Sequence, residues 1–295
     1  MTDTIPERVR RYVLDGSDAD LRRLLGISQL SAQRVRHALG TTGIQPGWRV
    51  IDCGCGPLGA LAVMAEMVGP AGRVVGVDFS EPTVSRARSV AAMLALDNVE
   101  VHVGDVHDMD AEALGGPFDL AFVRCFLMHQ PDPARTLARI ATLIRPGGWI
   151  VAHEPLRDPP PRSSPAIGAL AAYWEVLYES AERLGAPHGS VDHLARRAVD
   201  AGLEVVGENG FFDVMPSEMG FDLHAATIAA ARHRAVDVGA ATDQEIDVIE
   251  NALRIAIGEG YDWVSYPFFL ALTLRTPEAR IQASGVEPGV DAAVR

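Results

Sequence analysis

The chain has 295 residues, of which 26 are basic and 39 acidic, so its net charge is −13 at pH 7. None of the basic residues is lysine, which excludes Schiff-base chemistry and lysine-dependent phosphate loops. An acidic chain without a basic run is also unsuited to binding nucleic-acid backbone or an anionic membrane surface. With 48% hydrophobic residues, the composition predicts a globular protein with a substantial core.

The three cysteines, Cys53, Cys55 and Cys125, are too few for a disulfide framework and lack the spacing of a metal site. No apolar run reaches the length of a membrane span, and the first residues do not resemble a signal peptide. We therefore expect a cytoplasmic protein that binds neither a metal ion nor a membrane.

A helical segment is expected at residues 7–39, after which strands and helices alternate. The strands are expected at 48–52, 73–77, 99–103, 118–123 and 149–153, and the helices at 58–68, 82–96, 108–114 and 133–144. Because these strands are almost entirely apolar, they predict a parallel sheet with helices on both faces.

The second half of the chain begins with a segment, 155–165, that contains five prolines and is expected to be a stiff irregular loop. Helices are then expected at 166–184, 191–201, 217–236 and 243–257, and strands at 203–214 and 263–274. The tail that follows is rich in proline, glycine and alanine and is expected to be disordered.

Residues 50–59, with the sequence VIDCGCGPLG, combine an apolar strand, a glycine-rich turn and the start of a helix. An open parallel sheet binds its ligand at such a turn. Gly54 and Gly56 let the backbone approach a cofactor that a Cβ atom would exclude. Asp78, nineteen residues after Gly59, stands where related folds bind a ribose diol. These features alone fit either a dinucleotide or another nucleoside cofactor.

The charge of Asp52 favours the second of these alternatives. A carboxylate at this turn would repel a pyrophosphate by about 1–4 kcal/mol at a separation of about 4 Å, for effective dielectric constants of about 80 to 20. The same carboxylate would attract the sulfonium and ammonium groups of S-adenosylmethionine. Asp52 therefore predicts a positively charged cofactor that carries no phosphate.

Residues 48–153, and more loosely the chain as far as Leu274, resemble the class I S-adenosylmethionine-dependent methyltransferases. The matching segments are DCGCG at 52–56, VVGVDF at 74–79, GDV at 104–106, FDLAFV at 118–123, and LMHQPDP at 127–133 followed by LIRPGG at 143–148. One feature departs from the family. Many members carry a third glycine two residues after the second, where this chain has Leu58, and here the glycine comes one residue later.

The resemblance implies which residues bind S-adenosylmethionine, whose product after transfer is S-adenosylhomocysteine. The segment that contains Asp52, Gly54 and Gly56 would wrap the methionine end of the cofactor. Arg124, just past the fourth strand, would lie beside the same methionine moiety.

The resemblance also implies how the nucleoside is held. Asp78 would bind both ribose hydroxyls, and Phe79 would pack on the adenine ring. Asp105 would accept a hydrogen bond from the adenine amino group, and Val106, the next residue of the third motif, would also bind the cofactor.

The family fold is a Rossmann-like α/β sheet of seven strands in the order 3-2-1-4-5-7-6, with the last strand antiparallel and with helical lid insertions. We accordingly divide the chain into five parts. These are an N-terminal helical lid (1–45), the cofactor-binding core (46–154), a helical cap (155–200), the last two strands with inserted helices (201–276) and a disordered tail (277–295).

Three residues are candidates for catalysis. His129, six residues after the fourth strand, would act as a general base or orient the substrate, or would merely cap the following helix. Glu154, at the end of the fifth strand, would accept a hydrogen bond from an N–H or O–H of the acceptor. Tyr12 would contact the methionine carboxylate or the substrate, or would pack as an aromatic on an amphipathic helix.

Other aromatic residues allow two interpretations. Tyr173, Trp174 and Tyr178 recur at helical spacing and would line an aromatic pocket or fill a core. His224 belongs to no metal-ligand pattern and is interpreted as a surface or core histidine.

The resulting hypothesis is in-line methyl transfer from S-adenosylmethionine to a small organic molecule, an aromatic or heteroaromatic specialised metabolite, by a chain capable of forming a homodimer. The accepting atom, carbon, nitrogen or oxygen, stays undetermined. Two alternatives remain open, namely a nicotinamide-dependent oxidoreductase on a related sheet and a non-catalytic S-adenosylmethionine-binding partner subunit. A cyclase or decarboxylase that uses the cofactor only electrostatically is a further enzyme alternative.

Overall fold

Apolar strands pair into one sheet in the computed structural model, which describes residues 18–186 and 188–278. Along this sheet the strand order is β3-β2-β1-β4-β5-β8-β6, and β7 also pairs with β8. The strands are β1 (Arg49–Cys53), β2 (Arg73–Asp78), β3 (Val99–Val103), β4 (Phe118–Arg124), β5 (Ile144–Pro155), β6 (Ser163–Ser164), β7 (Glu204–Met215) and β8 (Trp263–Arg275).

The strand order confirms the predicted topology. β1 to β5 are parallel neighbours, β8 runs antiparallel to β5, and β7 pairs with the other edge of β8. The expected order 3-2-1-4-5-7-6 is therefore present once the two-residue strand β6 is set aside. β6 itself is a difference, because the proline-rich segment 155–165 was expected to be wholly irregular.

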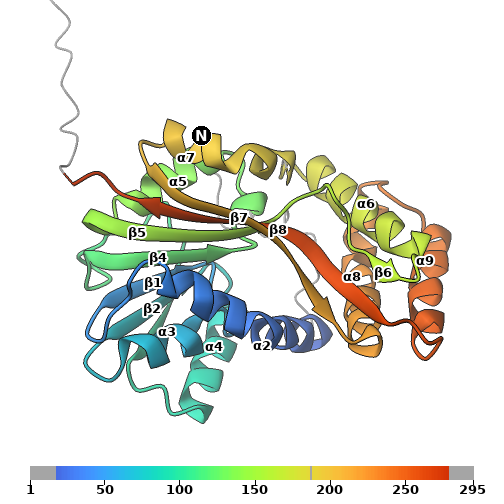
Figure 1. Ribbon diagram of the computed structural model, residues 1–295, viewed down its shortest axis with the longest axis horizontal. Coiled ribbons are helices and arrows are strands. Elements are labelled where there is room, and N and C mark those ends of the chain that lie inside the picture. Colours follow the sequence, from blue (N-terminus) through green and yellow to red (C-terminus); the bar gives the residue numbers. More distant parts are fainter. Residues whose placement is uncertain (1–17, 187, 279–295) are drawn as a thin grey trace, which may run out of the picture.

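Helices cover both faces of the sheet (Figure 1). α5 and α7 pack on one face, while α2, α3 and α4 pack on the other. The helices are α2 (Asp18–Gly40), α3 (Leu61–Val68), α4 (Glu81–Met93), α5 (Pro133–Ala141), α6 (Gly168–Arg183), α7 (Leu194–Asp200), α8 (Ser217–Asp237) and α9 (Asp243–Ala256), with 3₁₀ turns η1 (Leu127–His129) and η2 (His188–His193).

The helix expected at 108–114 is wrong, because the structure has hydrogen-bonded turns there. The Asp110 carboxylate accepts the backbone N–H of Glu112 at 3.1 Å, which is a turn contact that competes with helical hydrogen bonding. The backbone N–H of Gly116 then closes onto the carbonyl of Ala111 at 2.7 Å. The helix-like hydrophobic spacing was too short to overcome these local bonds.

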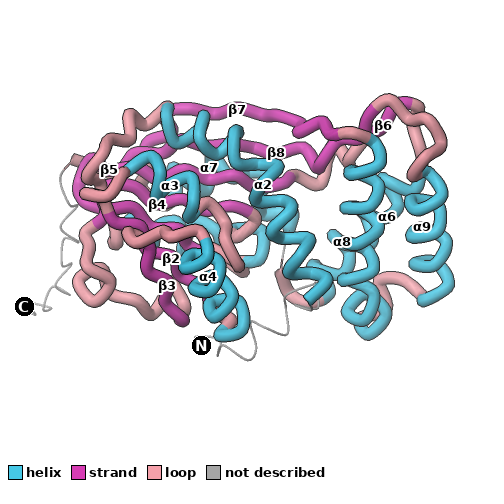
Figure 2. Tube along the Cα trace, turned by 90° about the horizontal axis from the view of Figure 1, so that it is seen from below, coloured by secondary structure: helices cyan, strands magenta, loops and turns pink. Residues whose placement is uncertain are grey.

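α6, α8 and α9 pack together into a helical cap with its own hydrophobic core, which also receives Ile27 of α2. The long strands β7 and β8 run from the core sheet toward this cap as a two-stranded ribbon (Figure 2). The cap therefore lies beyond the carboxyl ends of the parallel strands, where an open α/β sheet binds its ligand.

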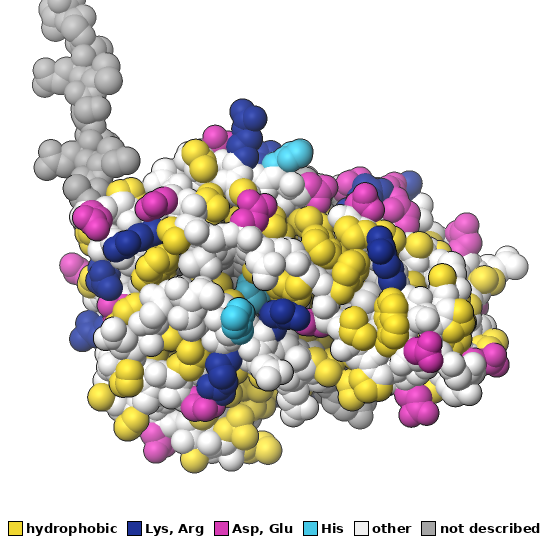
Figure 3. Space-filling view, in the orientation of Figure 1, with side chains coloured by type: hydrophobic (Ala, Val, Ile, Leu, Met, Phe, Trp, Pro, Cys, Tyr) yellow, Lys and Arg dark blue, Asp and Glu magenta, His cyan; other side chains and the backbone are white. Residues whose placement is uncertain are grey.

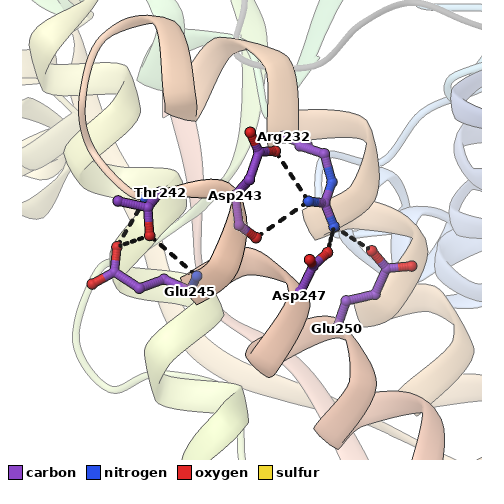
Figure 4. Close-up of polar contacts among 6 residues, drawn as sticks. All are labelled: Arg232, Thr242, Asp243, Glu245, Asp247 and Glu250. Atoms are coloured by element: carbon purple, nitrogen blue, oxygen red, sulfur yellow. Dashed lines mark hydrogen bonds and ion pairs between the residues drawn. The ribbon is translucent and has the colours of Figure 1, made fainter.

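An arginine joins α8 and α9 of the cap (Figure 4). Arg232 of α8 donates to three carboxylates of α9, with N–O distances between 2.7 and 3.2 Å. These carboxylates belong to Asp243, Asp247 and Glu250. Of the three carboxylates, only that of Asp243 lies in the first turn of α9, where the positive end of the helix dipole favours it.

α9 begins with a reciprocal cap, in which the Thr242 hydroxyl accepts the Glu245 N–H at 3.2 Å and the Glu245 carboxylate accepts the Thr242 N–H at 2.8 Å. We expect Thr242→Ala to lower the free energy of unfolding by about 1 kcal/mol, because it leaves a helix N–H without its acceptor. Thr242→Ser keeps the hydroxyl and is the matched control. Urea denaturation that gave the two variants equal stability would contradict the assigned cap.

Candidate active site

The site is assembled at the carboxyl ends of adjacent parallel strands. Asp52 lies near the end of β1 and Asp78 at the end of β2, whereas Asp105 comes two residues after β3. Arg124 ends β4 opposite His153 of β5. The structure therefore brings together, at one edge of the sheet, residues that are separated by up to 101 positions in the sequence, from Asp52 to His153.

The glycine-rich turn after β1 uses three left-handed backbone conformations. Gly54, Gly56 and Gly59 have φ values of 76°, 58° and 50°, which favour glycine. A Cβ atom at Gly59 would lie 2.3 Å from the Cys55 carbonyl oxygen and 2.5 Å from the Asp52 carboxylate. A glycine is therefore required at position 59, one residue later than the third glycine of many family members. This requirement explains the departure seen in the sequence.

The space beside Gly56 is different. A Cβ atom there would meet no described atom within 4 Å, although the backbone N–H of Gly56 donates to the Asp78 carboxylate at 3.1 Å. The second Asp78 oxygen accepts the Ser80 N–H at 2.9 Å, and burial raises the pKa of this carboxyl group. The turn thus combines open backbone with a fixed carboxylate, an arrangement that fits a ribose diol.

Asp52 lies beneath the turn with only 2% of its surface exposed. Its carboxylate accepts the backbone N–H of Ala60, the residue just before α3, at 2.8 Å. Burial raises the pKa of Asp52 to about 7, although the Ala60 hydrogen bond and nearby Arg124 oppose this shift. The amino end of α3, where dinucleotide-binding folds place a pyrophosphate, is therefore occupied by a carboxylate of the protein itself.

The nucleoside motifs lie beside Asp52. Asp105 is buried and accepts the His107 N–H on one carboxylate oxygen at 2.9 Å. Val106 is buried in the core cluster, and Phe79 is half-buried after β2. These placements keep Asp78, Phe79 and Asp105 together at the ends of β2 and β3, as the resemblance implied.

Glu154 does not have the role expected from the sequence. It is fully buried, and its two oxygens accept the backbone N–H groups of Phe126, Leu127 and Met128 at 2.9–3.2 Å. Because the side chain is fully buried and both oxygens accept backbone N–H groups, Glu154 is not presented to a substrate. The structure makes it a positioning residue that holds η1, the turn that carries His129.

We expect Glu154→Gln to destabilise the protein by about 1–3 kcal/mol, because the amide turns a donor toward backbone N–H groups. Burial raises the pKa of Glu154 from 4.5 to about 7, so the protonated carboxyl favours the folded state. That contribution is complete below pH 4.5 and is lost as the pH rises through 7. The difference in unfolding free energy between the wild type and Glu154→Gln should therefore be larger at pH 5 than at pH 8.

The exposed substitution Glu208→Gln serves as the control for this experiment, since Glu208 lies on the outer strand β7. A pH-independent loss in Glu154→Gln, after subtraction of this control, would contradict the assigned burial of the Glu154 carboxyl group.

The other candidates have mixed outcomes. His129 ends η1, and burial lowers the pKa of its imidazole to about 4, so the ring is neutral near pH 7. The Arg124 guanidinium donates to the Ser31 hydroxyl of α2 and so links β4 to the N-terminal helix. Tyr12 lies outside the described residues.

The aromatic run on α6 mainly supports the proline-rich segment. Trp174 donates through its indole N–H to the Arg157 carbonyl at 3.0 Å, and the Tyr178 hydroxyl donates to the Pro155 carbonyl at 3.1 Å. Both rings and Tyr173 are buried in the cap core. Core packing, one of the two interpretations of this run, accounts for these contacts.

Sequence reasoning missed Tyr266 of β8 and Arg23 of α2 as residues of this region. Arg23 lowers the pKa of the Cys125 thiol, and Cys125 raises the pKa of the Tyr266 phenol. Both residues therefore lie near the end of β4. The only sequence signal was their position in predicted elements, because long-range pairing of β8 with β5 and β7 sets their location. Within residues 18–186 and 188–278 there is no group of three or more His, Cys, Asp or Glu side chains that suits a metal ion, and no helix long and apolar enough to cross a membrane.

Residues 44–182 match a family model described as a methyltransferase domain. The match covers slightly less than half of the chain, so this segment is similar to methyltransferase domains. The match agrees with the predicted resemblance to the S-adenosylmethionine-dependent methyltransferases.

Two curated relatives extend the comparison. An uncharacterised 37.1 kDa protein in transposon Tn4556 of Streptomyces fradiae is 37% identical over 55% of this chain and 45% of its own length. Nocamycin O-methyltransferase of Saccharothrix syringae is 35% identical over 54% of this chain and 56% of its own length. The chain thus spans about half the length of the curated relatives it matches.

A solved structure supports the fold. The S-adenosylmethionine-dependent methyltransferase from Aquifex aeolicus is 19% identical and superposes with a TM-score of 0.50, covering 65% of this chain and 91% of that one. At this identity the similarity concerns the fold alone.

Proposed function

We propose that this chain transfers a methyl group from S-adenosylmethionine to a small organic acceptor of specialised metabolism. The observation that carries the proposal is the Asp52 carboxylate bonded to the Ala60 N–H at the amino end of α3. A diphosphate at that position would meet a buried acidic group instead of free N–H donors. The similarity to nocamycin O-methyltransferase supports the substrate class.

Residues at the carboxyl ends of β1, β2 and β3 would hold the cofactor. Gly56 would let the backbone approach it, Asp78 would hold the ribose hydroxyls, and Asp105 would accept from the adenine amino group. S-adenosylmethionine supplies an electrophilic methyl group that needs no further activation. The protein's contribution is then mainly to align donor and acceptor and to exclude water.

His129 would act only where the acceptor must lose a proton. Burial lowers the pKa of its imidazole to about 4, so the ring is neutral near pH 7 and would accept that proton only as a weak base. Glu154 would contribute indirectly, because it fixes the backbone of the turn that carries His129.

Incubation of the full chain with S-adenosylmethionine and a panel of small phenols, amines and carbon acids tests the proposal. Formation of S-adenosylhomocysteine together with a product 14 mass units heavier is the expected result, since a methyl group replaces a hydrogen atom. Binding without turnover would indicate a non-catalytic partner subunit. A product without the added mass would indicate a cyclase or decarboxylase, and binding of a nicotinamide cofactor instead would indicate an oxidoreductase.

A further inference from the structure

One buried polar group in the cap is used by none of the cofactor motifs. His224 of α8 is fully buried, and its Nε2 lies 2.9 Å from the carbonyl oxygen of Ser265. A carbonyl only accepts hydrogen bonds, so Nε2 carries the proton. Burial lowers the pKa of the ring to about 4, so the imidazole is neutral near pH 7 and Nδ1 is an acceptor. No described group donates to this buried Nδ1.

His224 stands in a row of aromatic rings. Tyr173 lies 4.8 Å from it, centroid to centroid, and Tyr266 lies 6.2 Å away in a stacked arrangement. From Tyr266 the row continues along the ribbon to Phe269 at 5.6 Å and Phe211 at 5.7 Å, both nearly parallel to their neighbours. We call Tyr173, His224, Tyr266, Phe269 and Phe211 the aromatic row. A further flat ring would make favourable stacking or edge contacts with the rings of such a row.

The aromatic row reaches the end of β4. Cys125 and Arg124, which follow and end that strand, both influence the pKa of the Tyr266 phenol. Arg23 of α2, itself buried, acts on the phenols of Tyr173 and Tyr266. Figure 3 shows hydrophobic side chains gathered over the cap half of this face, with histidine and arginine side chains where the cap meets the core. The row therefore connects His224 with the edge of the sheet at which the cofactor motifs meet.

We propose that His224 determines acceptor specificity, with Nδ1 accepting a hydrogen bond from a hydroxyl group on a planar aromatic acceptor that stacks along the aromatic row. This inference rests on the proposed methyltransferase function. The chemistry of the methyl acceptor follows from the aromatic row. A neutral nitrogen that accepts hydrogen bonds, next to two phenol rings, selects a molecule with an O–H donor over a bare hydrocarbon. His224 is then a binding residue for the ring and not a proton-transfer residue.

Calorimetric titration of the full chain with 2-naphthol and with naphthalene, each in the presence of excess S-adenosylhomocysteine, tests the proposal. The wild type should prefer 2-naphthol by about tenfold, the ratio that one buried hydrogen bond supplies. His224→Gln keeps an N–H near Ser265 and removes the acceptor, so the preference should disappear. His224→Asn places an amide oxygen near the position of Nδ1, so part of the preference should return.

If His224 had a purely structural role, His224→Gln would keep more of the 2-naphthol preference than His224→Asn, because Gln rather than Asn preserves the Ser265 contact. Retention of the preference in His224→Gln, or failure of the wild type to bind either probe, would overturn the proposal. The affinity for S-adenosylhomocysteine, measured first in each protein, should be unchanged in both variants. If the wild type fails to bind S-adenosylhomocysteine, the proposed function is wrong. The affinities for 2-naphthol and naphthalene are then compared without S-adenosylhomocysteine, and this comparison tests the role of His224 separately.

Discussion

Replacement of Gly59 by alanine is expected to abolish cofactor binding and to lower the free energy of unfolding by several kcal/mol. The left-handed conformation alone costs an alanine about 1–2 kcal/mol. In addition, the new Cβ would approach the Cys55 carbonyl oxygen to 2.3 Å and the Asp52 carboxylate to 2.5 Å, so the turn would have to open. Urea denaturation and titration with S-adenosylmethionine measure the two effects separately.

Gly56→Ala is the matched control. Gly56 has a similar φ of 58°, yet its Cβ would meet no described atom within 4 Å. This variant should lose only about 1–2 kcal/mol of stability. It should nevertheless bind S-adenosylmethionine weakly, because the Cβ would occupy space assigned to the cofactor. Equal stability of the two variants would show that the Gly59 turn is not closed as described.

The second large effect concerns the charge of Asp52. Because its pKa lies near 7 in the free protein, the carboxylate that attracts a cation becomes populated as the pH rises from 6 to 8. The affinity for S-adenosylmethionine should therefore increase by up to about tenfold over that range. Asp52→Asn should bind about 1–4 kcal/mol more weakly at pH 8, the energy of one charge pair at about 4 Å.

Two comparisons make this result specific. Subtraction of the Asp52→Asn profile removes any titration of the ligand's own amino group. S-adenosylhomocysteine lacks the sulfonium charge, so its affinity should depend less on both pH and substitution. An unchanged affinity for S-adenosylmethionine in Asp52→Asn would refute the electrostatic argument.

Much of the core could be predicted from the sequence because its signals are local. The sequence pattern within about ten residues determines the conformation of each apolar strand and of the glycine-rich turn. Accordingly, β1 to β5 occur where they were expected. The local pattern gave a wrong prediction at 108–114. Its hydrophobic spacing suggested a helix, but the Asp110 side chain accepts a backbone hydrogen bond that stabilises a turn instead.

The roles of buried side chains were harder to predict. The position of Glu154 at the end of a strand did not show that three backbone N–H groups of η1 would converge on its oxygens. The environment of His224 depends on Ser265 of β8, which lies more than forty residues later in the sequence. Such contacts are set by the packing of the cap against the ribbon, which leaves no pattern within either segment.

Titration of the full chain at pH 8 with S-adenosylmethionine and with ADP-ribose tests most directly whether the turn before α3 receives a cationic nucleoside. The two ligands share adenosine. S-adenosylmethionine adds a methionine chain with a sulfonium, an ammonium and a carboxylate group, whereas ADP-ribose adds a diphosphate and a second ribose. We expect S-adenosylmethionine to bind and ADP-ribose to bind at least about tenfold more weakly, as repulsion from Asp52 requires. Equal or tighter binding of ADP-ribose at this site would contradict the assignment.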